Sequence, residues 1–255
     1  GVTASALAQA KVALIGYAIT YADTHTNVNG FLPCPDQGQN NIVDGEANGS
    51  CGKDSTGVVQ KNISAIGRLP WKTLKISPLK DGNGDCFWYA VSGTYKNNPD
   101  TDLMNWDTSG LFQLMAPDGV SFLAGSSAVN QPVAIIFSPG PPIGTQARAA
   151  ATNTPSCGGN YVEANYLEND TVHNINNATT SATANSLTQF ISGSVKDLSG
   201  NEIVNDRLLF ITRDDIFNAI KKRNDFGSFV SLTLLNNSLA WINNTSACLM
   251  GNPLP

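Results

Sequence analysis

The sequence has few charged side chains. Lys, Arg, Asp and Glu make up 14% of its 255 residues, against roughly a quarter in typical soluble domains. The net charge is -5 and the pI is near 4.9, so no excess of basic residues is available to bind phosphate backbones. This composition excludes a general nucleic-acid-binding protein. It is typical of the neutral, polar surface of secreted or wall-exposed proteins.

Histidine is scarce as well: the chain contains His25 and His173 and no others. A zinc site or a Ser-His-Asp triad would need one of these two, and both lie in polar loop sequence. The sequence contains no G-x-S-x-G motif and no phosphate-binding glycine loop. We therefore expect a protein that is not an enzyme and that has no cofactor. A secreted hydrolase on a β scaffold is the third-ranked interpretation.

No stretch reaches the roughly 18 consecutive apolar residues of a membrane span, so the chain as given is expected to be soluble. The run from 4 to 22 nevertheless predicts a helix, with one glycine and with Lys11 as its one charge. Its apolar residues recur at intervals of three, four and seven, so they share one face. The residues of this predicted assembly helix are Leu7, Leu14, Ile15, Ala18 and Ile19. Because no capping box precedes it, we expect a longer helix whose front half is missing.

The chain has five cysteines and no C-x-x-C pair, which favours disulfides over a metal site and indicates an oxidising compartment. Cys34 and Cys51 flank a loop rich in Gly, Asn and Asp. Linking them would stabilise the fold by roughly 3 kcal/mol in the chain-entropy model. A second pair is expected among Cys86, Cys157 and Cys248, and the sequence does not choose between them.

The rest of the chain predicts an α+β fold, with one long N-terminal helix packed on an antiparallel sheet and with long disulfide-tied loops. We divide the chain into a helix at 1–23 and a head domain at 24–255. Residues 24–60 and 143–200 read as irregular. Strands are predicted at 86–92, 111–115, 120–123, 133–138 and 205–212, and short C-terminal helices at 216–223 and 228–243.

Two further residue groups are candidate binding sites. Asp81, Asn83 and Asp85 alternate as in the start of a calcium loop, but the later glutamate is missing and a tight turn explains them as well. The acids at 36, 44, 46 and 54 lie in the disulfide-tied loop, and a solvated loop is favoured there over a cation clamp. Trp106, between Asn105 and Asp107, is the best candidate for an exposed, ligand-stacking aromatic.

Several segments, in this order, resemble bacterial type IV pilin-like proteins, namely minor pilins and pseudopilins. They are 8–18 (AQAKVALIGYA), 32–36 (LPCPD), 66–74 (IGRLPWKTL), 88–93 (WYAVSG), 137–140 (FSPG) with 146–148 (QAR), and 205–214 (NDRLLFITRD). None of these segments is a catalytic motif.

The resemblance implies a specific biology. Pilin-like proteins carry a leader that a peptidase removes, and their apolar helix anchors the subunit in the inner membrane before it packs in a filament core. The chain is accordingly expected to be a structural subunit of a type IV pilus or of a related secretion or DNA-uptake filament. Its partners would be other pilin or pseudopilin subunits, and its location the periplasm or cell surface. The alternative is an adhesin-like head that binds a glycan or another surface ligand through Trp106 and region 143–200.

Overall fold

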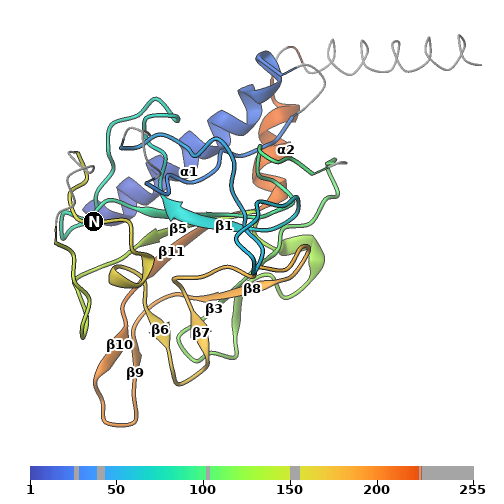
Figure 1. The fold of residues 1–255 in the computed structure, drawn as a ribbon. Coiled ribbons are helices and arrows are strands. Elements are labelled where there is room, and N and C mark those ends of the chain that lie inside the picture. Colours follow the sequence, from blue (N-terminus) through green and yellow to red (C-terminus); the bar gives the residue numbers. More distant parts are fainter. Residues whose placement is uncertain (26–28, 39–43, 102–103, 150–155, 224, 226–255) are drawn as a thin grey trace, which may run out of the picture.

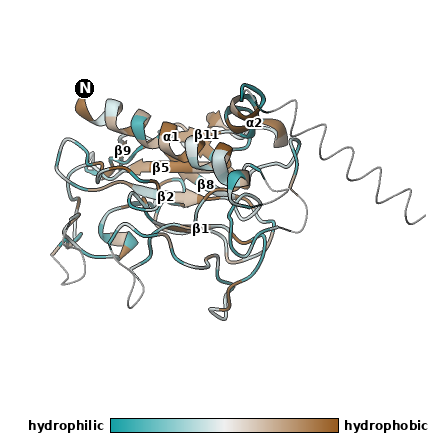
Figure 2. Cartoon of the chain, turned by 90° about the horizontal axis from the view of Figure 1, so that it is seen from above, coloured by the Kyte–Doolittle hydropathy of each residue, from teal (hydrophilic) through white to brown (hydrophobic). Residues whose placement is uncertain are grey.

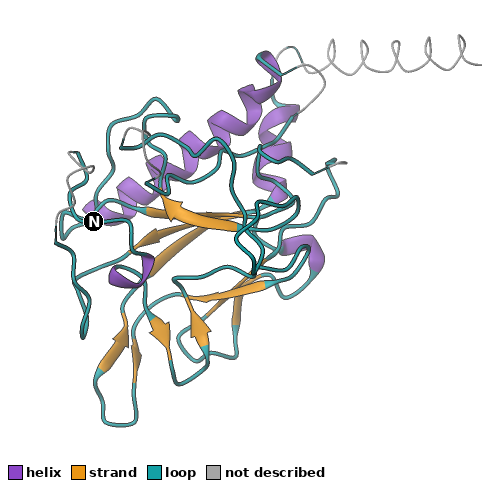
Figure 3. Cartoon of the chain, in the orientation of Figure 1, coloured by secondary structure: helices purple, strands orange, loops and turns teal. Residues whose placement is uncertain are grey.

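The computed structural model describes residues 1–25, 29–38, 44–101, 104–149, 156–223 and 225. Three layers are stacked (Figure 1). Helices α1 (Val2–Thr20) and α2 (Arg213–Lys221) cover one face of a four-stranded sheet, and a smaller sheet lies beneath its other face. Figure 3 distinguishes the helices from the strands of both sheets by colour. The α+β class predicted from the sequence is therefore correct.

The central sheet has the strand order β1-β2-β5-β11 and is antiparallel throughout. Its strands are β1 (Ala65–Arg68), β2 (Trp88–Val91), β5 (Ala134–Ser138) and β11 (Arg207–Ile211). Every residue of β5 is buried, as its continuous apolar run predicts. Figure 2 shows β5 in hydrophobic colours beneath α1.

Successive residues of β2 and β5 serve two different cores, because side chains alternate across a sheet. Tyr89 and Ile136 face the helices, whereas Trp88 and Phe137 face the smaller sheet. The smaller sheet contributes Phe112 to this second core. The central sheet thus holds the helical layer and the second sheet together.

The smaller sheet consists of β4 (Phe122–Ala124), β3 (Phe112–Met115) and β8 (Thr188–Ile191), in that order. The β3–β4 hairpin turns at Asp118-Gly119, between the two strands predicted at 111–115 and 120–123, and β3 also pairs with β8 in parallel. The sequence analysis assigned region 143–200 to irregular structure, and that assignment is wrong for several short elements. They are η3 (Glu163–Asn165), β6 (Asn169–Asp170), β7 (Ile175–Asn176), β8 and β9 (Val195–Lys196), which pairs with β10 (Glu202–Val204).

Two disulfides secure the long connections. Cys34 bonds to Cys51, the pair predicted from the sequence, and Cys86 bonds to Cys157, which settles one of the pairings left open. The second bond fastens region 143–200 to the central sheet, since Cys86 lies two residues before β2. Cys248 and the predicted helix at 228–243 lie outside the described residues.

Helix α2 begins with a complete capping box. Thr212 Oγ1 accepts a hydrogen bond from Asp215 N, and the Asp215 carboxylate accepts one from Thr212 N. Acidic residues therefore occupy its first turn and Lys221 its last, as the helix dipole favours. The remaining short helices are η1 (Tyr21–Asp23), which continues α1, and η2 (Ala128–Asn130).

Candidate functional site

One face of α1 is part of the main hydrophobic core. Leu14 and Ala18 are completely buried and Leu7 nearly so. Ile15 and Ile19 are half-buried against the same core cluster. Of the five residues predicted to mediate assembly, Leu7, Leu14 and Ala18 are therefore buried in the chain's own core, whereas Ile15 and Ile19 keep part of their surface exposed.

The one charge of the helix is also directed inward. Lys11 Nζ donates to Asp215 Oδ2 at 2.9 Å and to the carbonyl of Phe210 at 3.0 Å. Partial burial would by itself raise the pKa of Asp215, but hydrogen bonds from Thr212 and Lys11 outweigh it and the net shift is downward. The pair ties α1 to the start of α2 and leaves no charged group on the opposite face of α1.

That opposite face is uncharged and uncovered. Val2 is 74% exposed and Val12 is 70% exposed. A Cβ added to Gly16 would meet no atom within 4 Å. Ser5 and Gln9 complete a row at intervals of three and four, so these residues form one stripe along the helix. We call Val2, Ser5, Gln9, Val12 and Gly16 the free stripe.

The helix and its extension, Val2–Asp23, span 22 residues, and an 18-residue window within them has a mean hydropathy of 1.4 and is 28% buried. By length and composition this helix is long and apolar enough to cross a membrane. The sequence criterion of about 18 consecutive apolar residues did not identify it, because Lys11 interrupts the run. Such a helix indicates a membrane anchor or a signal sequence, and the two disulfides indicate an oxidising, extracytoplasmic compartment. An N-terminal apolar helix followed by a β-sheet domain is compatible with a pilin-like fold.

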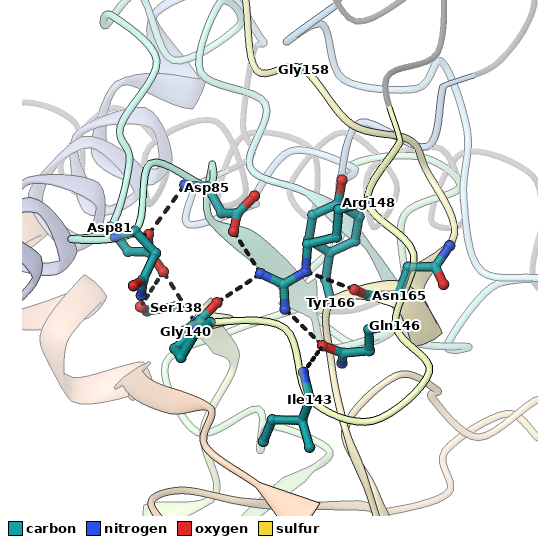
Figure 4. A network of polar contacts seen from close by, with 12 residues as sticks. Asp81, Asp85, Ser138, Gly140, Ile143, Gln146, Arg148, Gly158, Asn165 and Tyr166 are labelled. Atoms are coloured by element: carbon teal, nitrogen blue, oxygen red, sulfur yellow. Dashed lines mark hydrogen bonds and ion pairs between the residues drawn. The ribbon is translucent and has the colours of Figure 1, made fainter.

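The candidate calcium residues form a turn tied to the sheet (Figure 4). Asp81 Oδ1 accepts from the backbone N–H of Asn83 at 2.8 Å and of Asp85 at 3.2 Å. Its Oδ2 accepts from Ser138 Oγ and from Gly140 N. Within the described residues, no group of three or more His, Cys, Asp and Glu side chains could hold a metal ion. The geometry is that of the turn that the sequence favours.

Arg148 binds the same turn from the other side (Figure 4). Its Nη1 donates to Asp85 Oδ2 at 2.6 Å and to the carbonyl of Gly140 at 2.7 Å. Its Nε donates to the carbonyl of Asn165, and its Nη2 to Gln146 Oε1, both at 2.8 Å. One guanidinium therefore connects three segments by hydrogen bonds: the turn at 81–85, the end of β5 and the segment before β6. Arg148 accordingly has a structural role.

Two acids of the disulfide-tied loop are not solvated, contrary to the sequence interpretation. Asp36 is 1% exposed and Asp44 is 3% exposed. Asp36 Oδ2 accepts from Gly45 N at 2.7 Å and from the Tyr161 hydroxyl at 2.9 Å. Asp44 Oδ2 accepts from the backbone N–H of Cys157. Burial raises the pKa of Asp36, against the lowering effect of its hydrogen bonds. These carboxylates join the loop to the second disulfide.

Trp106 is 65% exposed, as the sequence analysis expects of an aromatic ligand platform. Three cavities lie elsewhere. One of about 430 Å³ lies beside Thr3 and Arg207, and one of about 620 Å³ runs along α1 at Gly16. The third, of about 450 Å³, lies against β7 and β8 and is lined by amide side chains such as Gln189. Trp106 lines none of these three.

Neither histidine belongs to a catalytic arrangement within the described part of the chain. His25 is exposed and stacks on Tyr21, with 3.9 Å between ring centroids. His173 Nδ1 lies 2.6 Å from Asp170 Oδ2 in a local turn, where Asp170 also accepts from the His173 N–H. In this part of the chain, no Ser or Cys side chain is hydrogen-bonded to either histidine.

One buried arginine is not among the residues that the sequence pattern identifies. Arg68 is 3% exposed at the end of β1. Its Nη2 donates to the carbonyls of Gly158 and Asn160 at 2.7 and 2.8 Å, and its guanidinium lies 4.9 Å from the Tyr161 ring centroid. A charge inside the otherwise apolar run at 63–71 is the signal that would have identified it.

The sequence pattern does not identify a pair of buried carboxyl groups either. Asp206 is completely buried and Glu168 is 5% exposed. Glu168 Oε2 accepts from the backbone N–H of Asn205 and Asp206, and Asp206 Oδ2 accepts from Glu168 N and from Asn177 Nδ2. Burial, and then the neighbouring Glu168, raise the pKa of Asp206 well above its usual value. No local pattern in the sequence links these two residues, which lie on separate segments.

In the comparisons with known proteins, no family model, no curated protein and no solved structure matches this chain.

Proposed function

We propose that this chain is a non-enzymatic, pilin-like structural subunit of a type IV pilus or of a related secretion or DNA-uptake filament. In this role it is a minor pilin or pseudopilin, anchored in the inner membrane before assembly. The observation that supports this proposal is the two-sided apolar character of α1. Leu7, Leu14 and Ala18 are covered by the chain's own head, whereas Val2 and Val12 of the free stripe are 74% and 70% exposed.

Val2 and Val12 expose apolar surface on this stripe, and burying apolar surface contributes about 25 cal/mol per Å². Ser5 and Gly16 are small, and a Cβ added to Gly16 would meet no atom within 4 Å, so another helix could approach closely at these positions. A neighbouring subunit that presents its own apolar helix would fill this space. The segments that resemble pilin-like proteins make such a helix the occupant that we propose.

The test is a charge on the free stripe. In the producing bacterium, Val12→Lys is expected to lower the amount of subunit recovered with assembled filaments by roughly tenfold or more, because a buried, unpaired ammonium group is costly. Val12 is 70% exposed, so the free energy of unfolding of the soluble chain should change by less than about 0.5 kcal/mol. Immunoblots of membrane and filament fractions measure the distribution.

Leu198→Lys is the matched control, because Leu198 is fully exposed on the β9–β10 turn. It should assemble like the wild type. A photo-crosslinking amino acid at position 12 should in addition give adducts with other pilin-like subunits, and the same residue at position 198 should not. Normal assembly of Val12→Lys, or equal adducts at both positions, would exclude α1 as the assembly surface.

A further inference from the structure

The cavity beside β7 and β8 is unlike the other two, because no charged residue lines it. It has a volume of about 450 Å³, within the roughly 300–1,000 Å³ of small-molecule sites. Its walls come from β3, β7, β8 and the segment at 179–181. Nearly all of its lining side chains carry an amide or a hydroxyl group, and Leu187 adds an apolar surface that is 46% exposed.

Two glutamines that line the cavity are hydrogen-bonded to each other and to the backbone. Gln113 and Gln189 are direct partners in the parallel β3–β8 pair. Gln189 Nε2 donates to Gln113 Oε1 at 3.1 Å, and Gln113 Nε2 donates to the carbonyl of Gly125 at 3.1 Å. These bonds orient both amides, so less side-chain entropy is lost when a ligand binds.

Several polar groups that line the cavity have no hydrogen-bond partner among the described residues and could bind a ligand. Among the described residues, none is hydrogen-bonded to Gln189 Oε1, to the Asn174 amide or to the Thr179 hydroxyl. Asn176 uses its Oδ1 to accept from Ala178 N, which leaves its amide N–H groups available. The cavity therefore offers both donors and acceptors beside the apolar side chains of Leu187 and the largely buried Ile175.

We infer that this cavity binds a neutral oligosaccharide. A sugar presents hydroxyl groups that both donate and accept, and amide side chains match them, while Leu187 can cover an apolar C–H face of the ring. An acidic polysaccharide or nucleic acid would find no cation in the lining, and a metal ion or amine would find no carboxylate. The inference does not depend on filament assembly, since the cavity lies within one chain.

The test uses the whole chain, labelled with 15N and titrated separately with maltotriose, N,N′,N″-triacetylchitotriose and trigalacturonate. At least one neutral trisaccharide should shift the backbone amide signals of residues 174–189 at millimolar concentration. Gln189→Ala and Thr179→Ala should each weaken this binding by about tenfold or more. Gln9→Ala, which alters an exposed glutamine on α1, should bind like the wild type.

The inference is overturned if no neutral trisaccharide shifts these signals. It is also overturned if trigalacturonate binds as well as the neutral sugars, or if the shifted signals cluster at Trp106. The amide spectra of the variants report whether they fold, because Gln189 and Thr179 are exposed and their replacement should leave other signals in place. Failure here would leave the filament proposal unchanged, and failure of the Val12→Lys test would leave the cavity unchanged.

Discussion

Asp206→Asn is expected to raise the free energy of unfolding at pH 8 by about 2 kcal/mol. Asp206 Oδ1 is buried and has no hydrogen-bond donor within the described residues, and the carboxyl of Glu168 is its neighbour. Two facing acceptors are stable only if one of them holds a proton. An asparagine amide supplies the missing donor without a proton from solvent.

The pH dependence follows from the direction of the pKa shifts. Burial raises the pKa of Glu168 and, more strongly, that of Asp206, so the folded chain retains a proton that the unfolded chain releases above about pH 4. The wild type should therefore lose stability as the pH rises from about 4 towards the raised pKa of Asp206. In Asp206→Asn this loss should be much smaller, and below about pH 4 the two proteins should differ little.

Urea unfolding between pH 4 and 9 measures both effects. Glu168→Gln should also flatten the pH dependence. The matched control is Asp197→Asn, because hydrogen bonds from Asn201 in an exposed turn lower the pKa of Asp197. It should lose stability at neutral pH instead of gaining it. A destabilised Asp206→Asn at pH 8 would show that the pair does not require a proton.

Local patterns in the sequence account for much of the central architecture. The unbroken apolar run at 133–138 predicts a strand buried on both faces, and β5 is such a strand. Spacing at three, four and seven identifies the buried face of α1 through Leu7, Leu14 and Ala18. Each of these two patterns involves residues that are close together in the chain, so it can be recognised from a single sequence.

The smaller sheet and the short strands around it could not be predicted as well from the sequence. Strands β6, β7 and β9 have two residues each, too few for alternation to be recognised. The parallel pairing of β3 with β8 joins segments more than seventy residues apart, so no turn links them in the sequence. Arg68, Asp36 and Asp206 read as surface residues by type, and their burial depends on partners that distant segments supply.

The free stripe shows a further limit of periodicity. Spacing identified the face of α1 that packs on the head, and the sequence analysis assigned assembly to that same face. Val12 and Gly16 also recur at intervals of three and four, but in a row with the polar Ser5 and Gln9, so their spacing did not identify an apolar face. Solvent exposure in the folded chain distinguishes the two faces, and it transfers the proposed assembly role to residues that the sequence did not single out.

Lys96→Met is expected to lower the free energy of unfolding by about 3 kcal/mol, which corresponds to a fall in Tm of about 10 °C for a chain of this size. Lys96 is completely buried, and its Nζ donates to the carbonyls of Cys51 and Gln60. Methionine fills the same volume but leaves both carbonyls without this donor. Each such loss costs roughly 1–3 kcal/mol, and together they release the end of the disulfide-tied loop.

The pH profile distinguishes this explanation from a simple packing defect. Burial lowers the pKa of Lys96 to about 8, from 10.5 in the unfolded chain. Between these values the unfolded chain binds a proton that the folded chain does not, so Lys96 makes wild-type stability rise with pH across this window. Lys96→Met should lack this rise, and Lys53→Met, at an exposed position in the same loop, should behave like the wild type. If Lys96→Met unfolds at the wild-type temperature, the buried ammonium does not hold the loop.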